Sequence, residues 1–252
     1  MAAMILLMGL LGLALGSFAS VIAHRVPRGE SIVSPRSRCP GCGTQIENRD
    51  NVPVLSWLLL RGRCRHCGER ISVLYPLLEL GVAIGFIAAL LVFEDEPAEI
   101  ALACVFLFTL AVITVTDLEL RIIPNKVLLP ASVIGVALIA AFAADTLPER
   151  AIAGAAAFAL LFVVALAYPQ GMGMGDVKLA AVLGLYLGRA VAPAMLFGFA
   201  LGAAYGAILV ARYGAEARKR AVPFGPFLAL GGVVGLWFGD EIVDWYLDTF
   251  TS

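Results

Sequence analysis

The chain has 252 residues, of which 61% are hydrophobic and 15% are charged, with a mean hydropathy of +0.92 and a formal net charge of −1. This apolar content exceeds what the core of a water-soluble domain needs, so the composition excludes a soluble protein and indicates a membrane protein. We predict an all-α, polytopic integral membrane protein that is surrounded by lipid and has no nucleic-acid partner.

The first apolar run, Met4–Ala23, is long enough to form a membrane-spanning helix. No basic residue precedes this run, and no cleavage site of small residues comes before the arginines that follow it. Both features argue against a signal peptide that is removed. We therefore expect residues 1–23 to be a retained first transmembrane helix.

The polar loop 24–73 contains four cysteines in two C-x₂-C pairs that are separated by 21 residues: Cys39, Cys42, Cys64 and Cys67. Four thiolates satisfy the tetrahedral preference of zinc and leave no position for water. Disulfides are the competing use, but the charge pattern places this loop in a reducing compartment. The spacing therefore predicts a structural Zn²⁺ site in a small zinc-ribbon-like loop.

Further apolar runs of roughly 17 to 25 residues follow the loop. They are Leu74–Phe93, Ala98–Thr116, Val127–Ala144, Ala151–Tyr168 and Val222–Phe238. Leu179–Ala211 is ambiguous, because its 33 residues would form a helix of about 50 Å against a hydrocarbon core of about 30 Å. This length is too great for one span and too small for two.

The distribution of basic residues decides the number of spans. With a periplasmic N-terminus, 16 of the 18 Lys and Arg residues fall in cytosolic loops. These loops are 24–73, 117–126, 169–178 and 212–221. A single span at 179–211 would put Arg218–Arg220 outside. We predict about eight spans, both termini periplasmic, a turn near Gly188–Arg189, and a core of seven helices within 74–252.

A glycine-rich stretch, "YPQGMGMGDVKLAAVLG", precedes the sixth span and carries Asp176. Because Leu179–Leu187 is too short to cross, this helix should begin near Met172 and hold Asp176 one turn inside the cytosolic face. Asp176 could simply cap the helix or pair with Lys178. A phosphate-binding loop is disfavoured, since a carboxylate at the helix start repels phosphate. Three glycines that let backbone approach closely favour a functional site.

Aspartic peptide hydrolysis needs two carboxylates that share a proton. Asp117 ends the third span, 59 positions before Asp176, and one span out and one span back separate them. Both return to the cytosolic boundary and can meet if the third and sixth helices are neighbours. Glu119 is the competitor for this role, but it lies further into the loop. Glu79, inside the second span, either has a function or pairs with an arginine.

Several motifs together resemble the type IV prepilin peptidases, a branch of the GxGD intramembrane aspartyl proteases. They are "GLALGSFASVIAHRVPRG", the cysteine loop ending in "YPLLELG", Asp117 before "IIP", "GMGD" before "VKLAAVLG", and "VPFGPFLALGG". The resemblance implies that Asp117 and Asp176 are the catalytic pair. One departure is Asn125, where family members often have aspartate after the proline.

The resemblance further implies removal of the short basic leader of prepilins and prepilin-like pseudopilins at the cytosolic face of the bacterial inner membrane. It also implies N-methylation of the new N-terminus with S-adenosylmethionine, for which the residues themselves offer no nucleotide-binding fingerprint. A non-enzymatic scaffold or insertion factor that docks a partner through its zinc loop is the alternative. A proton-relaying transporter fits less well, because no inverted repeat with paired broken helices is evident.

Overall fold

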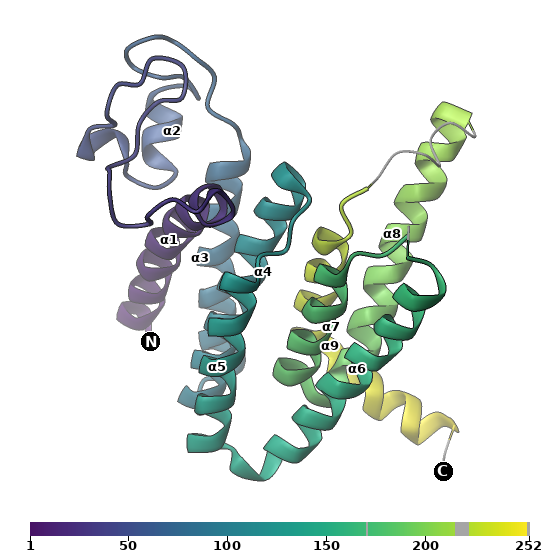
Figure 1. The fold of residues 1–252 in the computed structure, drawn as a ribbon. Coiled ribbons are helices and arrows are strands. Elements are labelled where there is room, and N and C mark those ends of the chain that lie inside the picture. Colours follow the sequence, from purple (N-terminus) through teal and green to yellow (C-terminus); the bar gives the residue numbers. More distant parts are fainter. Residues whose placement is uncertain (170, 215–221, 251–252) are drawn as a thin grey trace. The chain divides into compact units, whose positions relative to one another are not determined.

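The computed structural model describes residues 1–169, 171–214 and 222–250. Within them the chain is helical, and the only extended pairing is two isolated bridges, Arg38 with Gln45 and Arg63 with Arg70. The all-α prediction is confirmed for the described residues (Figure 1). The chain divides into two compact units, Met1–Ile100 and Ala101–Ser252. The expected division into a first helix (1–23), a cysteine loop (24–73) and a seven-helix core (74–252) stays a prediction.

Unit 1 consists of two long helices and the cysteine loop between them. Its elements are α1 (Ala2–Arg25), η1 (Val26–Arg28), η2 (Asn48–Asp50), α2 (Leu55–Leu59) and α3 (Leu74–Val92). Gly12 and Gly16 bring α1 against α3, because a Cβ on Gly12 would lie 2.5 Å from Ala83 Cα. A Cβ on Gly16 would lie 2.6 Å from Glu79 Cα. Small residues four apart allow this backbone approach in membrane helices.

Unit 2 is a helical bundle, and its first helix begins four residues before the unit boundary. Its elements are α4 (Pro97–Leu120), α5 (Asn125–Phe142), η3 (Ala144–Thr146), α6 (Leu147–Ala167), α7 (Met174–Leu187), η4 (Gly188–Ala190), α8 (Val191–Tyr213) and α9 (Gly225–Phe250). The helices α6 and α7 pack closely, as do α8 and α9. Helix α9 continues beyond the expected end of the last span through the acidic residues to Phe250.

Seven segments of the described chain are long and apolar enough to cross a membrane. One of them, Met174–Tyr213, has 40 residues and contains both α7 and α8, with η4 between them. Gly188, at the start of η4, has a φ of +57°, which favours glycine at this turn. The turn therefore lies where the sequence predicted it. The seven segments become the eight expected spans when Met174–Tyr213 is counted as two helices, α7 and α8.

The start of the sixth predicted helix is corrected by the structure. Helix α7 begins at Met174, two residues after the expected Met172, because Gly173 is extended at φ −80° and ψ 146°. Its 14 residues correspond to about 21 Å, clearly less than a hydrocarbon core of about 30 Å. Asp176 is consequently the third residue of the helix and belongs to its first turn.

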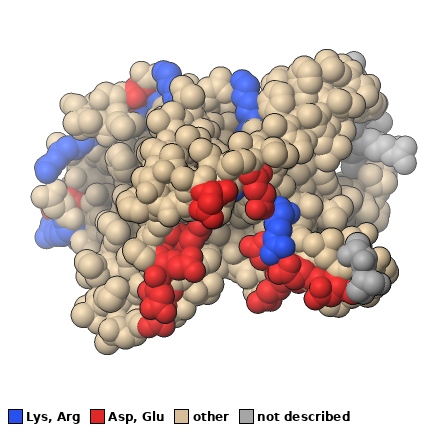
Figure 2. All heavy atoms as spheres, turned by 90° about the horizontal axis from the view of Figure 1, so that it is seen from below, with Lys and Arg blue, Asp and Glu red and all other residues tan. Residues whose placement is uncertain are grey.

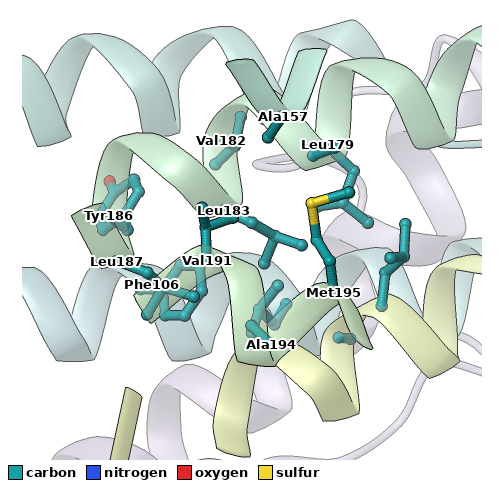
Figure 3. Packing of buried hydrophobic residues seen from close by; sticks show 14 of the residues in the cluster. Phe106, Ala157, Leu179, Val182, Leu183, Tyr186, Leu187, Val191, Ala194 and Met195 are labelled. Atoms are coloured by element: carbon teal, nitrogen blue, oxygen red, sulfur yellow. The ribbon is translucent and has the colours of Figure 1, made fainter. Parts of the chain in front are cut away.

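The core of unit 2 joins α4, α5 and α7 through one buried tyrosine. The ring of Tyr186 on α7 stacks on Phe106 of α4, with ring centroids 5.1 Å apart. Its hydroxyl donates a hydrogen bond of 2.6 Å to the Ala131 carbonyl of α5. Figure 3 shows these rings among the aliphatic side chains of the cluster. Helices α4 and α7 are the third and sixth predicted spans, and the stacked rings show that their side chains are in contact.

The two ends of unit 2 carry opposite charge. Arg189 in η4 forms salt bridges with Asp240 at 2.8 Å and Asp244 at 2.7 Å, and its backbone N–H donates to the Glu149 carboxylate at 3.1 Å. Figure 2 views this end of the helices, where Asp and Glu side chains gather. Basic residues lie at the other ends of the same helices, including Lys126 of α5. The positive-inside rule predicts that the basic end faces the cytosol and the acidic end the opposite side of the membrane.

The orientation of the chain can be tested with single introduced cysteines. We expect a thiol at Ser37, in the cysteine loop, to react with an impermeant reagent only after the cytosolic side is opened. A thiol at Ser252, which lies outside the described residues, should react from the periplasm. The measurement is labelling relative to the unsubstituted chain, which corrects for the native cysteines. Labelling of Ser252 from the cytosol would make the number of crossings odd and contradict the predicted topology.

Candidate active site

Asp117 lies in the last turn of α4 and is only 5% exposed. Its Oδ2 accepts a hydrogen bond of 2.8 Å from the backbone N–H of Gly225, at the start of α9. The donor belongs to the first turn of its helix, where N–H groups have no partner within the helix. The contact satisfies this donor and fixes one carboxylate oxygen of Asp117.

Asp176 lies in the first turn of α7 and is half-buried. Its Oδ2 accepts the Gly173 N–H at 3.3 Å, and the Asp176 N–H donates to the Gly173 carbonyl at 3.1 Å. The capping contact considered from the sequence is therefore present. Lys178 instead donates to the Asn125 side chain at 3.0 Å. A cap uses one acceptor position of the carboxylate and leaves others for chemistry.

The two aspartates are brought together at one end of unit 2. Asp117 is near enough for its charge to act on the Asp176 carboxylate. Glycine at position 175 permits this, because a Cβ there would lie 2.9 Å from Cβ of Ile123, in the segment that follows Asp117. Glu119, the competitor, is exposed. The structure thus places one buried and one half-buried carboxylate at the same end of unit 2, and their catalytic role stays a prediction.

Gly225 is a component of this site that the sequence analysis did not identify. It lies 108 positions from Asp117, within "VPFGPF". A Cβ at Gly225 would lie 2.8 Å from Asp117 Oδ2, so no other residue fits without moving the carboxylate. The glycine followed by proline was a visible signal of a helix start, but nothing in the sequence indicated its partner.

We expect Gly225→Ala to reduce any reaction that depends on Asp117 by about tenfold or more, since a displaced catalytic group loses its alignment. The matched control is Gly206→Ala in α8, where an added Cβ meets nothing within 4 Å. Both variants change one helical glycine to alanine. The measurement is the initial rate of leader cleavage in detergent-purified protein. Equal rates in the two variants would show that the contact with Gly225 does not matter for the reaction.

The four loop cysteines form a second site, within unit 1. Their Sγ atoms all lie within 4.8 Å of one another, and Cys39 and Cys67 are 3.7 Å apart. Ligands of a tetrahedral zinc ion with Zn–S bonds of about 2.3 Å are about 3.8 Å apart. The observed separation fits that geometry, so the cluster could hold a zinc ion.

Backbone hydrogen bonds shape each cysteine pair into a tight turn. The Cys39 N–H donates to the Thr44 carbonyl at 2.9 Å, and the Cys64 N–H donates to the Glu69 carbonyl at 2.8 Å. Gly43 adopts a φ of +69° that closes the first turn. Hydrogen bonds with the side chain and backbone of Thr44 lower the pKa of the Cys42 thiol to about 6. A low thiol pKa favours the thiolate, the form that binds metal, whereas burial and the neighbouring thiols raise the pKa of Cys67 to about 12.

Glu79, whose role the sequence left open, connects α3 to the loop. It is 7% exposed, and its Oε2 accepts the Val54 N–H at 2.7 Å. Val54 has a φ of +60°, which is strained for a β-branched residue, and the Leu55 N–H donates to the Pro53 carbonyl at 2.6 Å. The carboxylate therefore holds a strained turn just before α2. Pairing with an arginine, one of the two alternatives that the sequence left open, is not among the described hydrogen bonds of Glu79, which are with Val54 and the Ser17 side chain.

The fold and these sites define a polytopic helical membrane protein with paired carboxylates at one end of its bundle and a separate four-thiol cluster. Two family models match the chain: the bacterial peptidase A24 N-terminal domain at residues 10–93 and the type IV leader peptidase family at residues 104–208. The chain belongs to the type IV leader peptidase family.

Curated relatives cover nearly all of the sequence. A prepilin leader peptidase/N-methyltransferase of Bacillus subtilis is 36% identical over 97% of this chain and 98% of its own. Proteins with the same name from Aeromonas hydrophila and Stutzerimonas stutzeri are 32% and 33% identical, over 96% and 94% of this chain and 93% and 91% of their own. No solved structure matches the chain.

Proposed function

We propose that this protein is a bifunctional membrane enzyme that cleaves the leader peptide of prepilins and pseudopilins and methylates the new N-terminus. The observation that carries the proposal is similarity over almost the whole chain to proteins named for both activities. The paired aspartates support the first activity, because each lies in the part of the chain that matches the peptidase family.

Asp117 and Asp176 are the proposed catalytic pair. One carboxylate takes a proton from water while the other donates a proton to the oxygen of the scissile carbonyl. Two carboxylates that act on the same bond in an aspartic peptidase share one proton, and this pair is proposed to do the same. The Gly225 N–H leaves one oxygen of Asp117 in a fixed position, which supports a directed role for the other oxygen.

The short α7 supports cleavage within the cytosolic half of the membrane. Helix α7 is about 21 Å long, and the hydrocarbon core is about 30 Å thick. If the C-terminal end of α7 lies at the periplasmic surface, its N-terminal end lies inside the core. Asp176 would then lie inside the hydrocarbon core, about 10 Å or more from its cytosolic boundary. The apolar helix of a prepilin could lie in the bilayer while its leader, on the cytosolic side, presents the scissile bond to the aspartates.

The cysteine cluster is proposed to bind a structural Zn²⁺ on the cytosolic side. Cys39, Cys42, Cys64 and Cys67 would supply all four ligands, which leaves no open position for water. The zinc would organise the loop and take no part in peptide hydrolysis. The methyl donor is proposed to be S-adenosylmethionine, the usual source of an activated methyl group.

Mass analysis of a prepilin substrate tests both activities in one experiment. The substrate is incubated with the purified protein in lipid nanodiscs, with and without S-adenosylmethionine. We expect loss of the leader in both samples and an added methyl group only in the sample with the donor. An intact substrate in both samples would contradict the peptidase, and cleavage without methylation would contradict the second activity alone.

A further inference from the structure

A surface pocket of about 300 Å³ lies in unit 1 where the cysteine loop joins α3. Its wall contains three exposed arginines, Arg61, Arg63 and Arg70, and no acidic residue. Val73, which directly precedes the first residue of α3, completes the side of the pocket nearest the helix. The pocket therefore presents concentrated positive charge at the point where the chain enters a membrane-spanning segment.

The guanidinium groups of these arginines have no partner among the hydrogen bonds and ion pairs described for unit 1. Other arginines of the same loop differ. Arg65 binds the Asp50 carboxylate at 2.6 Å, and Arg25 donates to the Pro35 carbonyl at 2.7 Å. The pocket thus gathers arginine side chains whose donors are available to a ligand, and a fork of N–H donors matches the oxygens of a phosphate or carboxylate.

The backbone holds these like charges together. Arg63 and Arg70 face each other across an isolated antiparallel bridge, where like charges directly opposite one another are destabilising. Arg61 has a φ of +53°, which is uncommon for a residue other than glycine. A bound anion would offset the repulsion between the guanidinium groups, so the arrangement favours an anionic ligand.

An exposed apolar stripe on α3 begins at this pocket. Val73 continues the helix at its N-terminal end with φ −66° and ψ −16°, and it is 52% exposed. Leu77, Leu80 and Ile84 follow at spacings of four, three and four residues and are also exposed. Because α3 is apolar and long enough to cross a membrane, this stripe is suited to contact acyl chains. The arginines then lie at the level of the lipid headgroups.

The short helix α2 supports this placement. Its Trp57 lines the pocket, and its exposed face carries Leu55, Leu58 and Leu59 within one turn. Leucines on one exposed face are unfavourable in water, whereas an amphipathic helix at the membrane interface buries such a face among the lipids. The apolar face of α2 and the stripe of α3 therefore flank the arginines with groups that a lipid would cover.

We propose that this pocket binds one anionic phospholipid. Its phosphate would lie among Arg61, Arg63 and Arg70, and an acyl chain would follow Val73 and Leu77 along α3. A lipid is favoured over a soluble anion or an acidic protein segment, because the charged pocket continues directly into an apolar stripe on a membrane-spanning helix. Clusters of basic residues next to such helices attract anionic headgroups.

Native mass spectrometry of the full-length protein measures this binding. Protein in detergent is titrated with phosphatidylglycerol and, separately, with phosphatidylcholine, whose headgroup has no net charge. We expect the first phosphatidylglycerol to bind about tenfold more tightly or better. Excess inorganic phosphate should not displace it, since phosphate cannot contact the stripe. Equal affinity for the two lipids, or displacement by phosphate, would overturn the proposal.

A variant with Arg61→Gln, Arg63→Gln and Arg70→Gln tests the position of the site. It should bind the first phosphatidylglycerol about tenfold more weakly or worse, because each arginine near the surface contributes to the attraction. Thermal unfolding and metal content show whether the loop remains folded. Undiminished binding by a folded variant would overturn the site.

The matched control removes three exposed arginine charges from the same loop outside the pocket, with Arg36→Gln, Arg38→Gln and Arg49→Gln. Its affinity should stay within about twofold of the unsubstituted protein, as expected for a surface change. An equal loss in both variants would assign the binding to the overall charge of the loop and overturn the site.

Photocrosslinking locates the lipid in the unsubstituted protein, so the result does not depend on the folding of a variant. A phosphatidylglycerol analogue with a diazirine on its headgroup is incorporated into nanodiscs with the protein and irradiated. We expect crosslinks within residues 55–73. Crosslinks confined to residues 101–252 would overturn the proposal. Lipid binding is measured here without cleavage or methylation, so its outcome is independent of the proposed function.

Discussion

Replacing Asp117 or Asp176 with asparagine is expected to lower the rate of leader cleavage by about 10³-fold or more, because each change removes a group that must carry a proton. The fold should survive. An asparagine at 117 can still accept the Gly225 N–H, and one at 176 can still accept the Gly173 N–H. The measurement is the initial rate of cleavage of a prepilin by purified variants with unchanged thermal unfolding.

The control for this experiment is Glu119→Gln, which makes the same chemical change at an exposed carboxylate two residues from Asp117. Its rate should stay within about twofold of the unsubstituted protein, as expected for a surface change. Substantial cleavage by either aspartate variant would rule out the proposed pair. A loss in Glu119→Gln comparable to that in Asp117→Asn would instead transfer the role to the competitor.

Replacing both Cys39 and Cys42 with serine is expected to remove bound zinc almost completely and to unfold the loop. Two ligands cannot hold the ion, and the free energy of binding structural zinc, about 10 to 16 kcal/mol in small zinc domains, is also folding free energy. The measurements are metal content by elemental analysis and protease sensitivity within residues 24–73. Cleavage should fall through lost stability or docking, and methylation should fall at least as far.

The control for the cysteine variant is Cys104→Ser in α4, a cysteine outside the cluster, which should retain the metal. Two observations would count against the zinc site. One is a purified unsubstituted protein that holds no zinc and whose four loop thiols titrate freely. The other is full-rate methylation by the metal-free variant, which would separate the loop from the second activity.

The sequence predicted the main features of the fold because they depend on local patterns. Apolar runs located the helices, and the C-x₂-C spacing located the thiol cluster around Cys39 and Cys67. The return of the chain to one membrane surface also predicted that Asp117 and Asp176 lie at the same end and can meet if the third and sixth helices are neighbours. This prediction needed only the number of membrane spans between the two aspartates and no knowledge of side-chain packing.

Other features could not be predicted, because they depend on contacts between distant backbone groups. The Gly225 N–H reaches Asp117 only because α9 begins beside the end of α4, and glycine itself carries no chemical signal. Glu79 likewise meets the Val54 N–H through the folding of the loop back onto α3. The exact start of α7 was missed by two residues, because the glycine-rich stretch has weak preferences for any conformation.

The glycines of α1 imply that the first helix cannot be exchanged for a generic hydrophobic anchor. Gly16 lies against the backbone of Glu79, so the height of α1 in the membrane sets the position of the carboxylate that holds the turn at Val54. A foreign span with leucine at this position would force α3 away and release the loop. The residues of one helix thus serve both membrane insertion and the architecture of the loop.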